Sequence, residues 1–192
     1  MSVEDTLEYF NNLSEEDQKL FLDDFKVHQA NKGCEEYTQI AQWHVFISKD
    51  MKPTENPGKW MVFSNDIEYL NAICKEAVLK GIVTESKFTC LNQGKSLPGI
   101  FYVDITDIET HKNVVKYLIE KGAIARTKKG LYYNIAYKLD EQTRNNEYNT
   151  SFTAKLNLSN IINLESGEFK PDDEIRNAID NILQKKTNQE DQ

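Results

Sequence analysis

Four charged or titratable side chains stand where they could handle a phosphate group. His44 lies in the middle of the apolar stretch AQWHVFIS, Lys87 and Lys138 interrupt stretches that are otherwise typical of strands, and Arg144 follows in a polar segment. Lys95, in the loop NQGKSLPG, is a fifth candidate. A lysine within a strand must either face water or meet an anion. For each lysine taken singly, exposure to water is the simpler interpretation. A shared site would require the side chains of these residues to point into one cleft.

Such a set could eliminate phosphate from a phosphothreonine or phosphoserine side chain. A lysine can remove the Cα proton only when it is neutral, which requires burial or nearby positive charge to lower its pKa. Cationic groups that hold the phosphate supply that charge and stabilise the leaving dianion. A histidine beside the bridging oxygen suits the role of acid. The reaction requires neither a metal nor an organic cofactor, and we expect none.

The composition is that of a folded domain outside the membrane. Of the 192 residues, 39% are hydrophobic, and no apolar stretch approaches the roughly 20 residues that span a bilayer. The acidic start MSVEDTLEYF does not resemble a signal peptide, so we expect a cytoplasmic protein. Cys34, Cys74 and Cys90 have no metal-ligand spacing and are expected to be free thiols. The net charge of −8 gives no support for non-specific nucleic-acid binding.

Three segments differ in their patterns. Residues 1–40 are polar and helical in pattern, with Ser14 as a plausible N-cap before three acidic residues. Residues 41–170 contain the strand-like segments and are expected to form the core domain. Residues 171–192 are expected to form a helix that begins after Pro171 and ends in a frayed tail.

The core segment favours an α+β fold. One expected helix begins after Asp66 and ends at Gly81, and a second, with His111 on its surface, ends at Gly122. Strands and helices do not alternate strictly, so we expect a single domain with a curved, mostly antiparallel sheet and helices on one face. The expected strands are 41–48, 59–63, 86–91, 100–105, 131–139 and 152–158.

The alternation in the first of these strands suggests which face is buried. Trp43, Val45 and Ile47 share one face, which we interpret as the core, and His44 then lies on the opposite face. A pair of tryptophans could also stack on a base. For Trp43 core packing is favoured, whereas Trp60, at the start of a strand, remains open between the two roles.

Part of the core segment resembles a known family. The stretches GKWMVF, SKFT, IFYVDITD and YKLDEQTRNNEY, spread over roughly residues 42–150, resemble the uncharacterised family of the basophilic-leukaemia-expressed protein. That resemblance implies a sheet like that of the cap-binding translation initiation factor. It also implies a more distant similarity to the phosphothreonine lyase effectors of bacterial pathogens.

The similarity to the lyases assigns a role to each candidate. His44 in WHVFIS matches the catalytic acid, and Lys87 in the motif SKFT matches the catalytic base. Lys95, Lys138 and Arg144 match the three arginines that bind the phosphate. Two of these three are therefore lysine here, which offers a point charge in place of a rigid bidentate fork. The match also needs small gaps in both loops.

Two functions follow from these matches. The first is a phospholyase with the roles just given. The second is a non-catalytic module that uses the same cleft for a phosphorylated peptide, a nucleotide or an RNA end, which the lysine replacements favour. Whether the chain is an enzyme stays open at this point. A third possibility, an adaptor that binds protein through its acidic surface, has only the charge in its favour.

Overall fold

The computed structural model describes residues 3–91, 96–145, 147 and 153–190, with side chains from Leu7 to Gln184 within these ranges. The helices are α1 (Val3–Asn11), α2 (Glu15–Asn31), α3 (Ile67–Leu79), α4 (Ile108–Glu120), α5 (Asp140–Arg144), α6 (Asp172–Glu190) and the 3₁₀ helix η2 (Leu158–Asn160). The strands are β1 (Tyr37–Ile40), β2 (Trp43–Ile47), β3 (Pro57–Ser64), β4 (Glu85–Thr89), β5 (Leu97–Asp104), β6 (Ala136–Leu139) and β7 (Leu156–Asn157).

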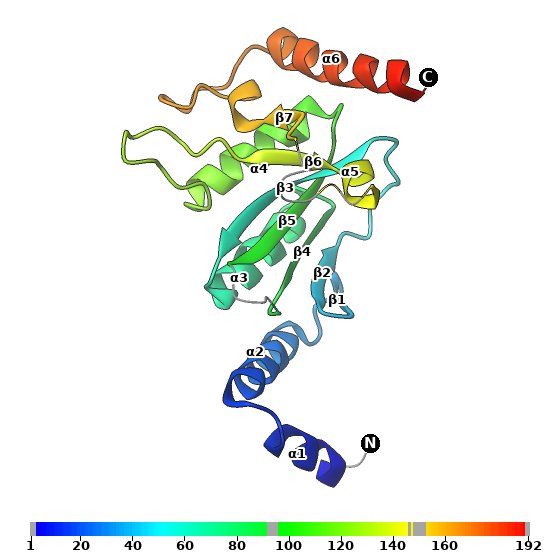
Figure 1. Cartoon of the computed structure of the whole chain (residues 1–192), viewed down its shortest axis with the longest axis vertical. Helices are drawn as coiled ribbons and strands as arrows, with labels where there is room; N and C mark the ends of the chain where they lie inside the picture. Colours follow the sequence, from blue (N-terminus) through cyan, green and yellow to red (C-terminus); the bar gives the residue numbers. More distant parts are fainter. Residues whose placement is uncertain (1–2, 92–95, 146, 148–152, 191–192) are drawn as a thin grey trace.

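The seven strands form one sheet in the order β1-β2-β4-β5-β3-β6-β7 (Figure 1). Every neighbouring pair is antiparallel. The sheet is curved, and it stays open because β1 and β7 are edge strands. The expected α+β fold with one antiparallel sheet is therefore confirmed.

Helices α3 and α4 cover one face of this sheet. The side chain of Asp66 caps α3 by accepting the Tyr69 N–H, as the sequence predicts. The Ser86 hydroxyl donates to the Cys74 carbonyl at 2.8 Å and ties β4 to α3. The large buried side chains between the sheet and the helices include Phe46, Trp60, Phe88 and Phe101 from the strands and Leu70 from α3. The other face, which we call the open face, has neither of these two helices upon it.

Helices α1 and α2 extend from the β1–β2 edge of the sheet, away from α6 (Figure 1). Ser14 caps α2 by accepting the Asp17 N–H, as expected. Within α2 only Val27 and Asn31 are buried, so little apolar surface holds this helix to the rest. At the other end α6 continues to Glu190, through most of the segment for which we expected a frayed tail.

Two expected strands are shorter than the pattern suggests. Strand β6 occupies only the last four residues of 131–139, because the earlier backbone pairs elsewhere. The Tyr132 N–H donates to the Leu164 carbonyl, and the Tyr133 N–H donates to the Ala125 carbonyl. Strand β7 has two residues and passes directly into η2.

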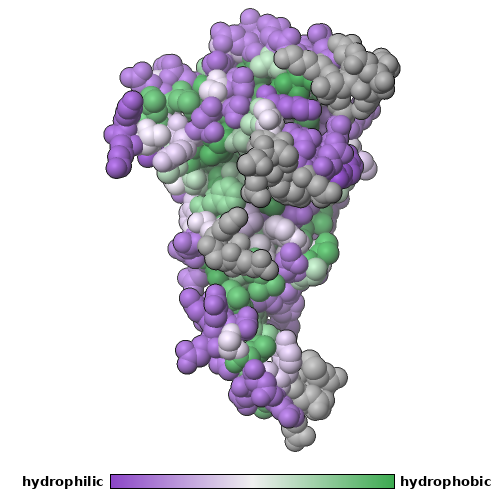
Figure 2. All heavy atoms as spheres, in the orientation of Figure 1, coloured by the Kyte–Doolittle hydropathy of each residue, from purple (hydrophilic) through white to green (hydrophobic). Residues whose placement is uncertain are grey.

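Hydrophilic residues cover most of the face seen in Figure 2, in keeping with the charged composition. Among the described residues, no helix combines the length and the apolar character needed to cross a membrane.

Candidate functional site

His44 lies on the helix-covered face of the sheet. It stands opposite Phe88 in the β2–β4 register, and its side chain is fully buried. The Nδ1 atom is 2.8 Å from the Tyr37 hydroxyl, and the Nε2 atom is 3.0 Å from Oδ1 of Asp24 on α2. Burial lowers the pKa of His44 despite the nearby Asp24 carboxylate. This histidine is thus a hydrogen-bonded residue of the core side.

Lys87 lies on the opposite face. It stands across from Val45, one residue away from the His44–Phe88 pair, and neighbouring residues of a strand point to opposite sides. The expectation that His44 and Lys87 share one cleft is therefore wrong. The strand alternates as expected, but the face that holds His44, and not the face that holds Trp43, is the one covered by helices.

The ammonium group of Lys87 lies between two aromatic rings. Its Nζ is 4.8 Å from the centre of the Trp43 ring and 5.1 Å from that of Tyr102. Burial lowers the pKa of Lys87, an effect that Glu85 partly offsets. Among the described residues, no carboxylate comes within ion-pair distance of this ammonium group, so aromatic rings are its close neighbours.

Two further lysines share the open face. Lys59 and Lys138 are directly paired across β3 and β6, and both are buried. The Nζ of Lys59 forms an ion pair with Asp140 at 2.7 Å, and that of Lys138 donates to the carbonyl of Glu147. Burial, and then the charge of Lys59, lowers the pKa of Lys138. We call Lys59, Lys87 and Lys138, with Trp43 and Tyr102, the lysine face.

Of the four sequence candidates that the structure describes, it brings two together. Lys87 and Lys138 belong to the lysine face, whereas His44 does not. Arg144 is exposed at the end of α5, and no contact among the described residues links it to the two lysines. Lys95 lies outside the described residues. Lys59 was missed, although the strand KWMVF places a lysine among apolar residues in the same way as the other two.

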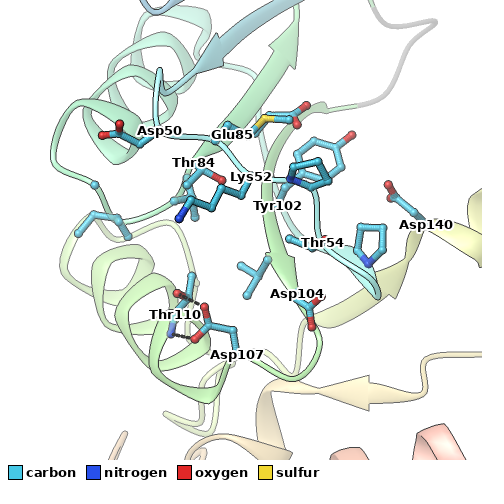
Figure 3. Close-up of a pocket in the computed structure, with 17 residues that line it drawn as sticks. Asp50, Lys52, Thr54, Thr84, Glu85, Tyr102, Asp104, Asp107, Thr110 and Asp140 are labelled. Atoms are coloured by element: carbon cyan, nitrogen blue, oxygen red, sulfur yellow. Dashed lines mark hydrogen bonds between the residues drawn. The ribbon is translucent and has the colours of Figure 1, made fainter.

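An acidic cavity adjoins the lysine face. It has a volume of about 770 Å³ and lies beneath the loop that contains Lys52 and Thr54 (Figure 3). Tyr102 borders both the cavity and the lysine face. The carboxylates that line the cavity are Asp50, Glu85, Asp104, Asp107 and Asp140. Burial raises the pKa of Glu85. The cavity therefore suits a cationic or hydrogen-bond-donating group.

The burial of three side chains decides the expectations for His111, Trp60 and Trp43. His111 is fully buried rather than on the helix surface, and its Nδ1 accepts the Trp60 Nε1–H at 2.9 Å. Trp60 is itself fully buried and cannot stack on a ligand. Trp43, expected in the core, is half-buried on the open face instead.

The side chains around His44 come from parts of the chain that no sequence pattern connects. Cys90 Sγ lies 3.3 Å from the same Nε2 atom that faces Asp24. Asp24 comes from α2 and Cys90 follows β4, so these residues are far apart in the chain. Their separation gives no local motif that a search for ligand spacing could detect.

The chain matches no family model, no curated protein and no solved structure in the three comparisons made.

Proposed function

We propose that the lysine face binds a phosphate monoester. The observation that carries this proposal is the position of Lys87, whose half-buried ammonium is held between Trp43 and Tyr102 without an ion-paired carboxylate among the described residues. An incoming phosphate would supply the missing anion in a site of low polarity, where a charge-assisted hydrogen bond is strong. Lys138 adds positive charge on the same face, whereas the charge of Lys59 is compensated by Asp140.

The carboxylates of the acidic cavity favour a ligand that carries a positive charge next to its phosphate. A phosphate bound at Lys87 would leave the neighbouring part of the ligand beside Glu85 and Asp140. A peptide with a phosphothreonine or phosphoserine next to lysine or arginine carries both charges in that order. A longer RNA would instead bring further phosphates against the carboxylates, which repel them. We therefore favour a phosphopeptide with basic neighbours.

Catalysis of β-elimination is a second candidate function. Its support is the lowered pKa of Lys87, which the base of that reaction requires, together with the resemblance of SKFT to the lyase motif. His44 cannot be the acid because it faces the other side of the sheet. Glu85 shares the face of Lys87, and burial raises its pKa, so it is the residue that would protonate the leaving phosphate.

Isothermal titration calorimetry tests the binding proposal. The full chain is titrated with a phosphothreonine peptide flanked by lysines, its unphosphorylated form, the same phosphopeptide flanked by glutamates, and a nucleoside monophosphate. We expect the basic phosphopeptide to bind most tightly. Lys87→Ala should weaken it by about tenfold or more. Lys116→Ala is the matched control, because Lys116 is exposed on α4.

The outcomes separate the alternatives. Equal binding of the phosphorylated and unphosphorylated peptides contradicts phosphate recognition. Tighter binding of the nucleotide than of any phosphopeptide contradicts the ligand class but keeps the phosphate site. Mass spectrometry of the recovered phosphopeptide tests the second function: loss of phosphoric acid supports elimination, and an unchanged mass in every sequence context rejects it.

A further inference from the structure

Three side chains that commonly bind metals meet beneath the N-terminal helix α2. They are Asp24 of α2, His44 of β2 and Cys90, which follows β4. One donor atom from each lies within 4.8 Å of the other two. His44 Nε2 lies 3.0 Å from Asp24 Oδ1 and 3.3 Å from Cys90 Sγ.

We propose that Asp24, His44 and Cys90 bind a divalent ion of the zinc class. Carboxylate, imidazole and thiolate are the three ligand types that zinc accepts, and the thiolate disfavours magnesium and calcium. With bonds of about 2.0–2.3 Å in a tetrahedral site, neighbouring ligand atoms stand about 3.3–3.6 Å apart. The observed distances of 3.0 and 3.3 Å require the donors to separate by only a few tenths of an ångström.

Two of the proposed ligands have hydrogen-bond partners that would orient them toward an ion. When Nε2 binds the ion, Nδ1 carries the proton and donates it to the Tyr37 oxygen, 2.8 Å away. The Tyr37 hydroxyl can then turn toward Nδ1 of His28 at 3.4 Å. The Gln39 amide lies 3.1 and 3.3 Å from the two carboxylate oxygens of Asp24 and orients that ligand.

Solvent can reach the site. The side chain of Asp24 is 30% exposed, and Cys90 lines a cavity of about 190 Å³ together with Glu16, Lys19 and Asp23. An ion can therefore enter without unfolding of the sheet. Three protein ligands leave a fourth position, which water or an exogenous group would occupy.

Such an ion would fasten α2 to the sheet. Asp24 belongs to the helix and the other two ligands belong to the sheet side, whereas α2 buries only Val27 and Asn31 of its own residues. Metal binding would therefore stabilise the docked position of α2 more than the rest of the fold. The proposed metal site is separate from the lysine face, because His44 and Lys87 lie on opposite faces of the sheet.

Cobalt(II) is the probe that distinguishes metal ligation from a hydrogen-bonded cluster. The full chain is treated with a chelator, checked for folding by circular dichroism and titrated with Co²⁺. We expect a thiolate-to-cobalt charge-transfer band that saturates at about one equivalent, with displacement of the band by Zn²⁺. Cys90→Ser should remove the band, whereas Cys34→Ser should retain it, because Cys34 is outside the cluster.

Further variants keep the test decisive if Cys90→Ser fails to fold. Asp24→Asn, at the partly exposed ligand, should weaken Co²⁺ binding, and Gln39→Ala should weaken it by about 10–100-fold. Zn²⁺ should also raise the melting temperature of the wild-type chain. Absence of a charge-transfer band in the folded wild-type chain, or a band that is unchanged in the folded Cys90→Ser and Asp24→Asn chains, would overturn the proposal.

Discussion

The ammonium nitrogen of Lys87 lies 4.8 Å from the centre of the Trp43 ring, on the sheet face that α3 and α4 leave uncovered. Tyr102 approaches the same nitrogen from the other side at 5.1 Å. Cation–π contact compensates part of the cost of burying the ammonium, and burial still lowers its pKa. A residue kept in this position at a cost to stability is a sign of function.

Replacement of Lys87 by Met should therefore leave the chain as stable as the wild type, or more stable, at pH 7. The folded pKa lies below the ordinary value of 10.5, so the unfolded chain holds this proton more tightly and wild-type stability rises as the pH approaches 10.5. The advantage of Lys87→Met should accordingly shrink with rising pH. Urea unfolding of both chains at pH 7 and 9.5 measures this difference in the free energy of unfolding. A difference that grows with pH would contradict a lowered pKa of Lys87.

Acid should destabilise the chain through His111. Burial lowers its pKa from 6.5 to about 4, and the Trp60 Nε1–H requires its Nδ1 as an acceptor. The unfolded chain thus binds a proton that the folded chain refuses, and stability falls as the pH drops from about 6.5 towards 4. The full loss is about 3 kcal/mol.

The control for this effect is His111→Asn, whose side-chain oxygen can still accept from Trp60 but does not titrate. Chemical denaturation between pH 7 and 4 should show a smaller loss of stability in this variant than in the wild type. Parallel pH profiles for the two chains would show that other groups cause the acid sensitivity.

The ion pair of Lys59 with Asp140 should matter more than a surface pair. The Lys59 side chain is only 9% exposed, so Asp140→Asn leaves a buried ammonium without its carboxylate. We expect a loss of about 2 kcal/mol, with allowance for the partial exposure of Asp140. Glu120→Gln, in the exposed pair with Lys116, should change stability by less than about 0.5 kcal/mol. Equal effects in thermal unfolding would contradict the burial argument.

Local signals in the sequence predict most of the elements, but they predict neither β1, which lies in the segment expected to be helical, nor the faces of the sheet. The caps Ser14 and Asp66 have short-range partners, and both lie where expected. Strand β2 instead offers apolar residues on both sides, so alternation alone could not show that Phe46 faces the helices and Trp43 does not. The faces depend on which side α3 packs against, which is a long-range property.

The residues of the lysine face and of the Asp24–His44–Cys90 cluster also meet through contacts between distant parts of the chain. Lys59 and Lys138 meet only because β3 pairs with β6, and Asp24 meets Cys90 only because α2 folds back beside the sheet. The sequence predicts a surface position for His111, because no local pattern shows that Trp60 needs a buried acceptor. The sequence thus identified Lys87 and Lys138 as unusual residues of strands, without their partners.

Tryptophan fluorescence reports on phosphate binding at the lysine face, because Trp43 contacts Lys87 and the only other tryptophan, Trp60, is buried. The chain is titrated with the basic phosphothreonine peptide and, separately, with its unphosphorylated form. We expect a saturable change in fluorescence with the phosphopeptide alone; this change should disappear in Trp43→Phe and should require Lys87. No change in the wild-type chain, or the same change in folded Lys87→Ala, would contradict phosphate binding at the lysine face.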